Sequence, residues 1–192
     1  MPIVESRYRN VPFYLFNGHV QSIYPSVYRK VEGVSYERER LTLSDGDFVD
    51  LDWIDNDCDK LLIITHGLEG NTDRQYVKGA AKLFAKEGWD VLAWNCRSCS
   101  GEMNKAFRLY GHGEIGDIGE VVSHAQKRKA YKEISMMGHS LGGSITLKYL
   151  AVNAPQLDGN IKSATVFSTP CDLRVGAEVL NKRSNKIYRN KF

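Results

Sequence analysis

From residue 60 onward, short continuous apolar runs alternate with segments whose apolar positions recur at helical spacing. The runs are typical of strands covered on both faces, and the segments are typical of amphipathic helices. The expected strands occupy residues 61–65, 89–94, 134–137 and 161–168. The expected helices occupy residues 76–86, a segment after Gly116 and a segment after Ser140. Strands that alternate with helices in this way predict a right-handed, mostly parallel α/β sheet.

Before residue 60, apolar and polar residues alternate instead. Residues 34–43 and 48–53 flank the turn signal Asp45-Gly46, which predicts an antiparallel hairpin. Several aspartates in this region lack the spacing of a calcium loop, and we expect them to form a solvated strand face. They are Asp47, Asp50, Asp52, Asp55, Asp57 and Asp59. Residues 1–32 show no clear periodicity and are interpreted as an N-terminal extension that could lie across the sheet. Residues 33–192 are then the N-terminal portion of a single α/β domain.

Composition is typical of a globular protein and narrows the range of partners. The chain has 192 residues, which suits one domain, with 26% charged and 42% hydrophobic residues. A net charge of +3 is too small to indicate nucleic-acid binding. No apolar run could span a bilayer and no secretory core is present, so we expect no stable membrane insertion and a cytoplasmic location. Four cysteines do not make a disulfide framework, and Cys96 and Cys99 are interpreted as ordinary thiols.

The strongest chemical signal is a G-x-S-x-G pattern centred on Ser140, between an expected strand and an expected helix. A sharp turn there would strain the serine backbone, and Gly138, Gly142 and Gly143 would supply the space that the turn needs. The hydroxyl would stand exposed at a helix N-terminus, where developing negative charge is favoured. Ser140 is therefore predicted to be a nucleophile, with a structural Ser-Gly turn as the alternative.

A second loop is expected to meet Ser140 at the same edge of the sheet. The strand at 61–65 ends in the sequence HGLEG, and sheets of this kind bind ligands at the carboxyl ends of their strands. An acyl-transfer site needs two donors aimed at the oxyanion. We assign these donors to the backbone N–H groups of Leu68 and Leu141. An ordinary glycine turn that closes the strand is the alternative.

Together these motifs resemble the YheT-like branch of the α/β-hydrolases, which includes esterases, lipases and medium-chain acyl-ester synthases. The resemblance extends from about residue 11 to the end of the chain. The matching segments are 17–25 (NGHVQSIYP), 45–53, 66–70, 94–102 (WNCRSCSGE) and the turn at Ser140. The resemblance implies the α/β-hydrolase fold, a small hydrophobic ester as substrate, Ser140 as nucleophile, and no metal or organic cofactor. Two departures are mild: the family usually has glycine at Ser98 and often phenylalanine at His139.

The resemblance also implies a catalytic acid and a histidine that follow Ser140 in the chain. The five histidines are His19, His66, His112, His124 and His139, and all of them precede Ser140. His139 is interpreted as a packing residue, and a swing of His112 toward Ser140 is considered but not favoured. Asp172 is interpreted as part of a structural turn, because the family places its acid one strand later. The triad Asp and His are then not in the chain, which is expected to be a truncated or inactive form.

Two functions remain open from the sequence. The first is a serine hydrolase of carboxylic esters that forms an acyl-enzyme on Ser140. The second is a non-catalytic remnant of the fold that binds a lipid or a protein partner. In either case the strand at 161–168 would be an uncovered apolar edge containing Ala164, Val166 and Phe167. Such an edge predicts self-association.

Overall fold

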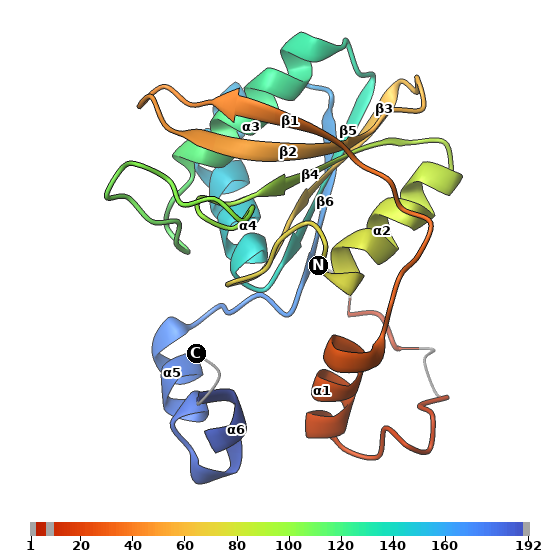
Figure 1. Ribbon diagram of the computed structural model, residues 1–192, viewed down its shortest axis with the longest axis vertical. Coiled ribbons are helices and arrows are strands. Elements are labelled where there is room, and N and C mark those ends of the chain that lie inside the picture. The colour runs from red at the N-terminus through yellow and green to blue at the C-terminus, as the bar shows by residue number, and fades with distance from the viewer. Residues whose placement is uncertain (1–2, 7–9, 190–192) are drawn as a thin grey trace.

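The computed structural model describes residues 3–6 and 10–189, which form one six-stranded sheet with helices on both faces (Figure 1). The strands are β1 (Glu37–Thr42), β2 (Phe48–Ile54), β3 (Lys60–Thr65), β4 (Asp90–Asn95), β5 (Glu133–His139) and β6 (Ile161–Phe167). The helices are α1 (Gly18–Tyr28), α2 (Gln75–Lys86), α3 (Gly116–Arg128), α4 (Leu141–Asn153), α5 (Leu173–Leu180) and α6 (Lys186–Arg189). Two short 3₁₀ turns are η1 (Ala154–Gln156) and η2 (Arg183–Asn185).

The sheet has the strand order β1-β2-β4-β3-β5-β6. β1 and β2 form an antiparallel hairpin, and β2 pairs antiparallel with β4. β4, β3, β5 and β6 run parallel to one another. Thr65, the last residue of β3, lies opposite Gly138 of β5. The carboxyl ends of these two central strands therefore lie side by side, and this edge of the sheet carries the candidate site.

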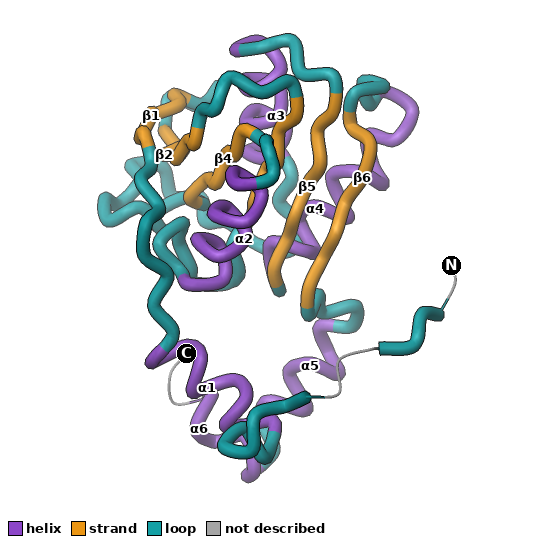
Figure 2. The backbone as a smooth tube through the Cα atoms, turned by 90° about the vertical axis from the view of Figure 1, so that its right-hand side faces the viewer, coloured by secondary structure: helices purple, strands orange, loops and turns teal. Residues whose placement is uncertain are grey.

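The central strand β3 explains why helices cover both faces of the sheet. Leu61 and Ile63 pack in the core under α3 and α4, whereas Leu62 and Ile64 pack in the core under α2. Successive side chains of a strand point to opposite faces, so a continuous apolar run fills two cores. Figure 2 shows the resulting layers, with α2 on the face opposite α3 and α4.

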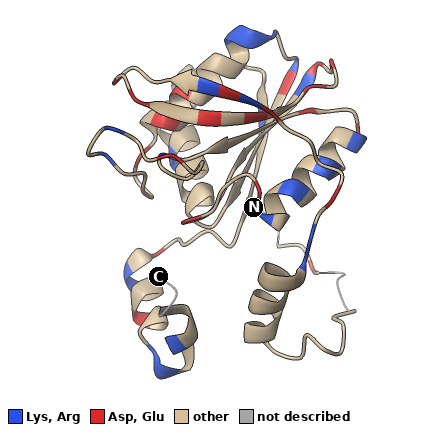
Figure 3. Ribbon diagram, viewed as in Figure 1, with Lys and Arg blue, Asp and Glu red and all other residues tan. Residues whose placement is uncertain are grey.

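The hairpin aspartates differ from the solvated strand face expected from the sequence. Asp50 and Asp52 are only 2% and 1% exposed. The Nε atom of Arg40 lies 2.8 Å from Asp50 Oδ1. The Nε atom of Arg38 lies 2.7 Å from Asp52 Oδ1, and Figure 3 shows basic and acidic residues alternating along β1 beside acidic residues on β2. Asp47 is buried as well. The expectation is wrong for these three residues because arginines supply the charge that burial of a carboxylate requires.

The N-terminal segment forms a helix that was not predicted from the sequence. α1 begins after Asn17, whose Oδ1 accepts a hydrogen bond from the Val20 N–H at 2.9 Å. The helix lies beyond the carboxyl ends of the strands and not across the sheet, so that expectation is wrong (Figure 1). Nδ1 of His19 lies 3.0 Å from the hydroxyl of Tyr188, which brings α1 next to α6 (Figure 2).

β6 lies at the edge of the sheet, as expected, with β5 as its only neighbour among the described strands. None of its residues is buried, and Phe167 is 46% exposed. Within the described residues, no helix is both long enough and apolar enough to cross a membrane.

Candidate active site

Ser140 lies on the sharp turn between β5 and α4. Its backbone has a φ of 52° and a ψ of −118°, a conformation that residues other than glycine rarely adopt. The Ser140 N–H donates to the carbonyl oxygen of Phe167 at 2.8 Å, which ties the turn to the end of β6. The serine side chain is exposed. The turn therefore presents a hydroxyl to solvent at the N-terminus of a 13-residue helix.

Glycines allow this turn because β3, β5 and α4 approach one another at the level of the backbone. A side chain on Gly142 would collide with the carbonyl oxygens of His66 and Thr65 at the end of β3. A Cβ on Gly138 would lie only 2.6 Å from the carbonyl oxygen of Gly142. α4 therefore starts directly against the end of β3, and no larger residue fits at either position.

His66 holds the loop that follows β3. Its imidazole is 1% exposed, and its Nε2 atom accepts a hydrogen bond from the Cys96 N–H at 3.0 Å. Because Nε2 is an acceptor, the proton is assigned to Nδ1, which donates to the Gly67 carbonyl oxygen at 2.7 Å. Burial lowers the pKa of His66 to about 4, so the ring is neutral at physiological pH. No role was predicted for His66 from the sequence, although a histidine directly after a buried strand was a visible signal.

Two tyrosines hold the rest of this loop. The Tyr76 hydroxyl accepts a hydrogen bond from the Gly67 N–H at 3.1 Å. The Tyr110 hydroxyl accepts one from the Glu69 N–H at 2.8 Å. A Cβ on Gly70 would lie 2.8 Å from the Tyr76 hydroxyl and 2.9 Å from the Gly67 carbonyl oxygen, so the loop closes only with glycine there. The loop backbone beside Ser140 is thus anchored on both sides.

Ser140 and Leu68 line one pocket of about 390 Å³. The other lining residues are Gly67, Tyr76, His139, Phe167 and Ser168. Within the described part of the chain, neither the Leu68 N–H nor the Leu141 N–H donates a hydrogen bond to another group. The structure therefore brings Leu68 and Ser140 to one cavity.

The five histidines all lie in the described residues, and none of them forms a hydrogen bond with Ser140. The His139 ring packs between Tyr76, with centroids 4.6 Å apart, and Phe167, with centroids 5.0 Å apart. Nδ1 of His112 lies 3.2 Å from the Ser144 hydroxyl, one helical turn beyond Ser140. The remaining three pair elsewhere: His66 with Cys96, His19 with Tyr188, and His124 with Glu39.

Asp172 is the N-cap of α5. Its Oδ1 accepts hydrogen bonds from the Arg174 N–H at 2.9 Å and the Val175 N–H at 3.0 Å. An aspartate in this position satisfies helix donors that would otherwise be unpaired. Both Cys96 and Cys99 are free thiols. No group of three or more His, Cys, Asp or Glu side chains in the described residues could hold a metal ion.

Arg97 joins the loops around the site, although no role was predicted for it from the sequence. Its side chain is 1% exposed, and its Nε and Nη2 atoms donate to the two carboxylate oxygens of Asp117 at 2.7 and 2.8 Å. Nη2 also lies 2.8 Å from Asp45 Oδ2. Asp117 lies in the first turn of α3, and Asp45 lies in the β1–β2 turn. One guanidinium therefore connects the end of β4 to both segments.

Comparison with known proteins identifies the family. Residues 56–191 match the protein family described as Serine aminopeptidase, S33. The chain belongs to this family. It is 30% identical over 177 residues to the Escherichia coli (strain K12) protein named "Putative esterase YheT", which covers 90% of this chain and 52% of that protein. It is also 26% identical over 168 residues to Phospholipase ABHD3 of Bos taurus, covering 83% of this chain and 40% of the relative.

Solved structures show the same fold. The esterase Pf2001 of Pyrococcus furiosus matches with a TM-score of 0.63 at 22% sequence identity, over 80% of this chain and 62% of that one. The family and the α/β-hydrolase fold class predicted from the sequence are thus confirmed, and the chain is an α/β hydrolase of the esterase and lipase group. The chain spans about half the length, or less, of the curated relatives described here.

Proposed function

We propose that the chain carries the nucleophile and the oxyanion-binding groups of a serine hydrolase that acts on carboxylic esters. The observation that supports this most directly is the exposed Ser140 hydroxyl on a turn of positive φ, in one pocket with Leu68. Ser140 Oγ attacks the ester carbonyl carbon, and its proton passes through a base to the departing alcohol. The N–H groups of Leu68 and Leu141 bind the oxyanion, and water then hydrolyses the acyl-serine.

Among the described residues, no histidine forms a hydrogen bond with Ser140 that would let it act as the base for this reaction. No histidine follows Ser140 in the 192-residue sequence. A serine without a base is a weak nucleophile, and loss of the histidine in another serine triad costs on the order of 10⁶ in turnover. We therefore propose that these residues alone acylate slowly, and that full activity needs an imidazole from outside them.

The pocket favours an ester over the amino-terminal peptide bond that the family description suggests. An aminopeptidase must bind a positively charged amino terminus, which calls for a carboxylate nearby. The described residues that line the Ser140 pocket include no aspartate or glutamate, and Glu69 lines neighbouring cavities but not this one. Leu68, Tyr76 and Phe167 instead offer apolar surface to an acyl chain. Together with the esterase and phospholipase named among the relatives, this supports a hydrophobic ester with a short or medium acyl chain.

Labelling with a fluorophosphonate probe tests the proposal. We expect slow modification of the 192-residue chain that accelerates when free imidazole is added as a substitute base. Peptide mapping should place the adduct on Ser140, and Ser140→Ala should abolish it. Ser144→Ala, one helical turn away, should label like the wild type. A chain that binds a hydrophobic ester but never labels, even with imidazole, would overturn the proposal in favour of a non-catalytic binding module.

A further inference from the structure

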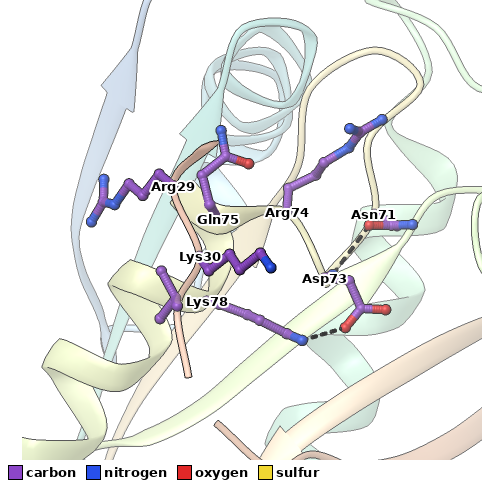
Figure 4. Close-up of a pocket in the computed structure, with 8 residues that line it drawn as sticks. Arg29, Lys30, Asn71, Asp73, Arg74, Gln75 and Lys78 are labelled. Carbon is purple, nitrogen blue, oxygen red and sulfur yellow. Dashed lines mark hydrogen bonds and ion pairs between the residues drawn. The ribbon is translucent and has the colours of Figure 1, made fainter. Parts of the chain in front are cut away.

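A second pocket, of about 540 Å³, lies at the start of α2 and has a different chemical character (Figure 4). We call it the basic pocket. Its ionisable lining residues are four cations and one carboxylate, namely Arg29, Lys30, Arg74, Lys78 and Asp73. They come from two separate stretches of the chain, the residues after α1 and the residues around the start of α2. The lining carries three more positive than negative side chains, which is an unusual concentration for a protein with a net charge of +3.

The positive charge of the basic pocket is only partly neutralised. Lys78 Nζ lies 2.7 Å from Asp73 Oδ1, and this pair accounts for the one carboxylate. In the described part of the chain, Lys30 takes part in no ion pair. Figure 4 shows Lys30 and Lys78 extending toward Asn71 and Asp73. Two ammonium groups and an amide thus face one region of the pocket.

Arg74 keeps its charge while it braces the loop beside Ser140. Its Nη2 atom donates to the carbonyl oxygen of Glu69 at 2.9 Å. A carbonyl oxygen accepts the hydrogen bond without cancelling the charge of the guanidinium. Arg74 therefore adds to the positive potential at the point where the basic pocket approaches the loop that contains Leu68.

A small cavity shares lining residues with the basic pocket on one side and with the Ser140 pocket on the other. Arg74 and Gln75 line the basic pocket and also a cavity of about 170 Å³. Leu68 and Tyr76 line that same cavity and also the Ser140 pocket. The Cα atoms of Arg74 and Tyr76 are at most about 7 Å apart, because each residue spans no more than about 3.6 Å. An ester bound at Ser140 would reach the basic pocket by way of this cavity.

We propose that the basic pocket binds a phosphate group carried by the ester substrate. A phosphate monoester has a charge of about −1.5 to −2 at neutral pH and offers several strong acceptor oxygens. Lysine and arginine donors form short, charge-assisted hydrogen bonds with such oxygens. This inference rests on the proposed function, since it assigns the neighbouring pocket to another part of the same substrate. It makes phosphate-bearing acyl esters the preferred class over neutral ones.

Calorimetric titration of the 192-residue Ser140→Ala chain tests the proposal without turnover. The ligands are monohexanoylglycerol phosphate, neutral monohexanoylglycerol and inorganic phosphate. The phosphate ester should bind at least about tenfold more tightly than either of the other two, and this advantage should shrink as salt is added. Lys30→Gln should weaken binding of the phosphate ester about tenfold, as expected for one lost charge-assisted contact, and leave the neutral ester unchanged.

Two further variants separate a phosphate site from general effects of charge or folding. Lys127→Gln makes the same charge change at an exposed position of α3, on the other face of the sheet, and should leave binding unchanged. Asp73→Asn removes the carboxylate that competes for Lys78, so it should tighten binding of the phosphate ester, a gain that a damaged fold cannot produce. Equal affinity for the two esters would overturn the proposal. So would equal weakening by Lys127→Gln and Lys30→Gln, or inorganic phosphate that binds as tightly as the phosphate ester.

The two proposals fail in different ways. If Ser140 labels with the fluorophosphonate but the phosphate gives no advantage in binding, only the assignment of the basic pocket is wrong. If the phosphate ester binds through Lys30 but Ser140 never labels, the pocket recognises its ligand and the hydrolase proposal is wrong.

Discussion

The Nε2 atom of His66 accepts a hydrogen bond from the Cys96 N–H across 3.0 Å. His66 follows β3 directly and Cys96 follows β4 directly, so this bond joins the carboxyl ends of two adjacent parallel strands. The same ring donates through Nδ1 to the Gly67 carbonyl oxygen. A neutral imidazole, with one donor and one acceptor, suits this position, whereas a protonated ring has two donors and loses the bond from Cys96.

His66 should therefore make the chain less stable as the pH falls from about 6.5 to 4. Burial lowers its pKa in the folded state from 6.5 to about 4, while the unfolded chain keeps the ordinary value. The unfolded state binds the proton first, so the contribution of His66 is complete above pH 6.5 and is lost progressively down to pH 4. The total loss is on the order of 3 kcal/mol.

Urea unfolding at pH 7 and at pH 5 measures this effect. Wild type should lose about 2 kcal/mol between the two pH values, in addition to the contributions of other groups. His66→Asn should be less stable at pH 7 and should lose less on acidification. Ser140→Ala is the control. It removes no group that titrates in this range, so its loss of stability between pH 7 and pH 5 should equal that of the wild type. An equal loss in His66→Asn and wild type would show that His66 is not buried in its neutral form.

Gly142→Ala should destabilise the chain, because the added methyl would collide with the carbonyl oxygens of His66 and Thr65. Backbone atoms cannot move aside as a flexible side chain can, so we expect a loss of about 3 kcal/mol or more in the free energy of unfolding. Gly176→Ala in α5 is the matched control, since nothing lies within 4 Å of a Cβ there. That variant should be neutral or slightly stabilising. Similar stability of the two variants would contradict the close contact between β3 and α4.

Replacing Arg97 with methionine should cost about 3–5 kcal/mol, because it leaves buried Asp117 without its bidentate partner. Lys132→Met breaks the ion pair between Lys132 and Asp59, in which both side chains are exposed, and should cost less than about 1 kcal/mol. Denaturant unfolding of both variants gives the comparison. If Arg97→Met lost no more than Lys132→Met, the guanidinium would not be the main link between these loops.

The uncovered β6 edge should cause self-association of the 192-residue chain. Edge strands with unpaired backbone groups pair with other chains, and lysine on such a strand opposes the pairing. Thr165 is exposed on β6, so Thr165→Lys should shift the chain toward monomer in size-exclusion chromatography with light scattering. Val152→Lys adds the same charge at an exposed position of α4 and should leave the oligomers in place. A monodisperse wild-type monomer would rule out association through this edge.

The bounds of the central strands and of α2 were predicted from the local sequence pattern to within one or two residues. The expected strand at 161–168 corresponds to β6 (Ile161–Phe167), and the expected helix at 76–86 corresponds to α2 (Gln75–Lys86). Their apolar residues are spaced by the geometry of the element itself, so the period is visible in the sequence. α1 was missed although Val20, Ile23 and Val27 recur at helical spacing, because Pro25 lies inside the helix and proline ordinarily indicates a helix boundary.

By itself, the sequence determined the family, the strand–turn–helix around Ser140, and the second loop that contains Leu68. These features depend on short-range spacing and on glycines within a few residues of each other. Only the tertiary structure decided that Asp50 and Asp52 are buried, that His66 joins two strand ends, and that Arg74 faces a basic pocket beside the Ser140 pocket. The physical reason is that the partners lie far apart in the chain: Cys96 comes 30 residues after His66, and Lys30 comes from before the first strand. The spacing of residues along the sequence does not reveal such pairs, because only the folding of the chain brings their members together.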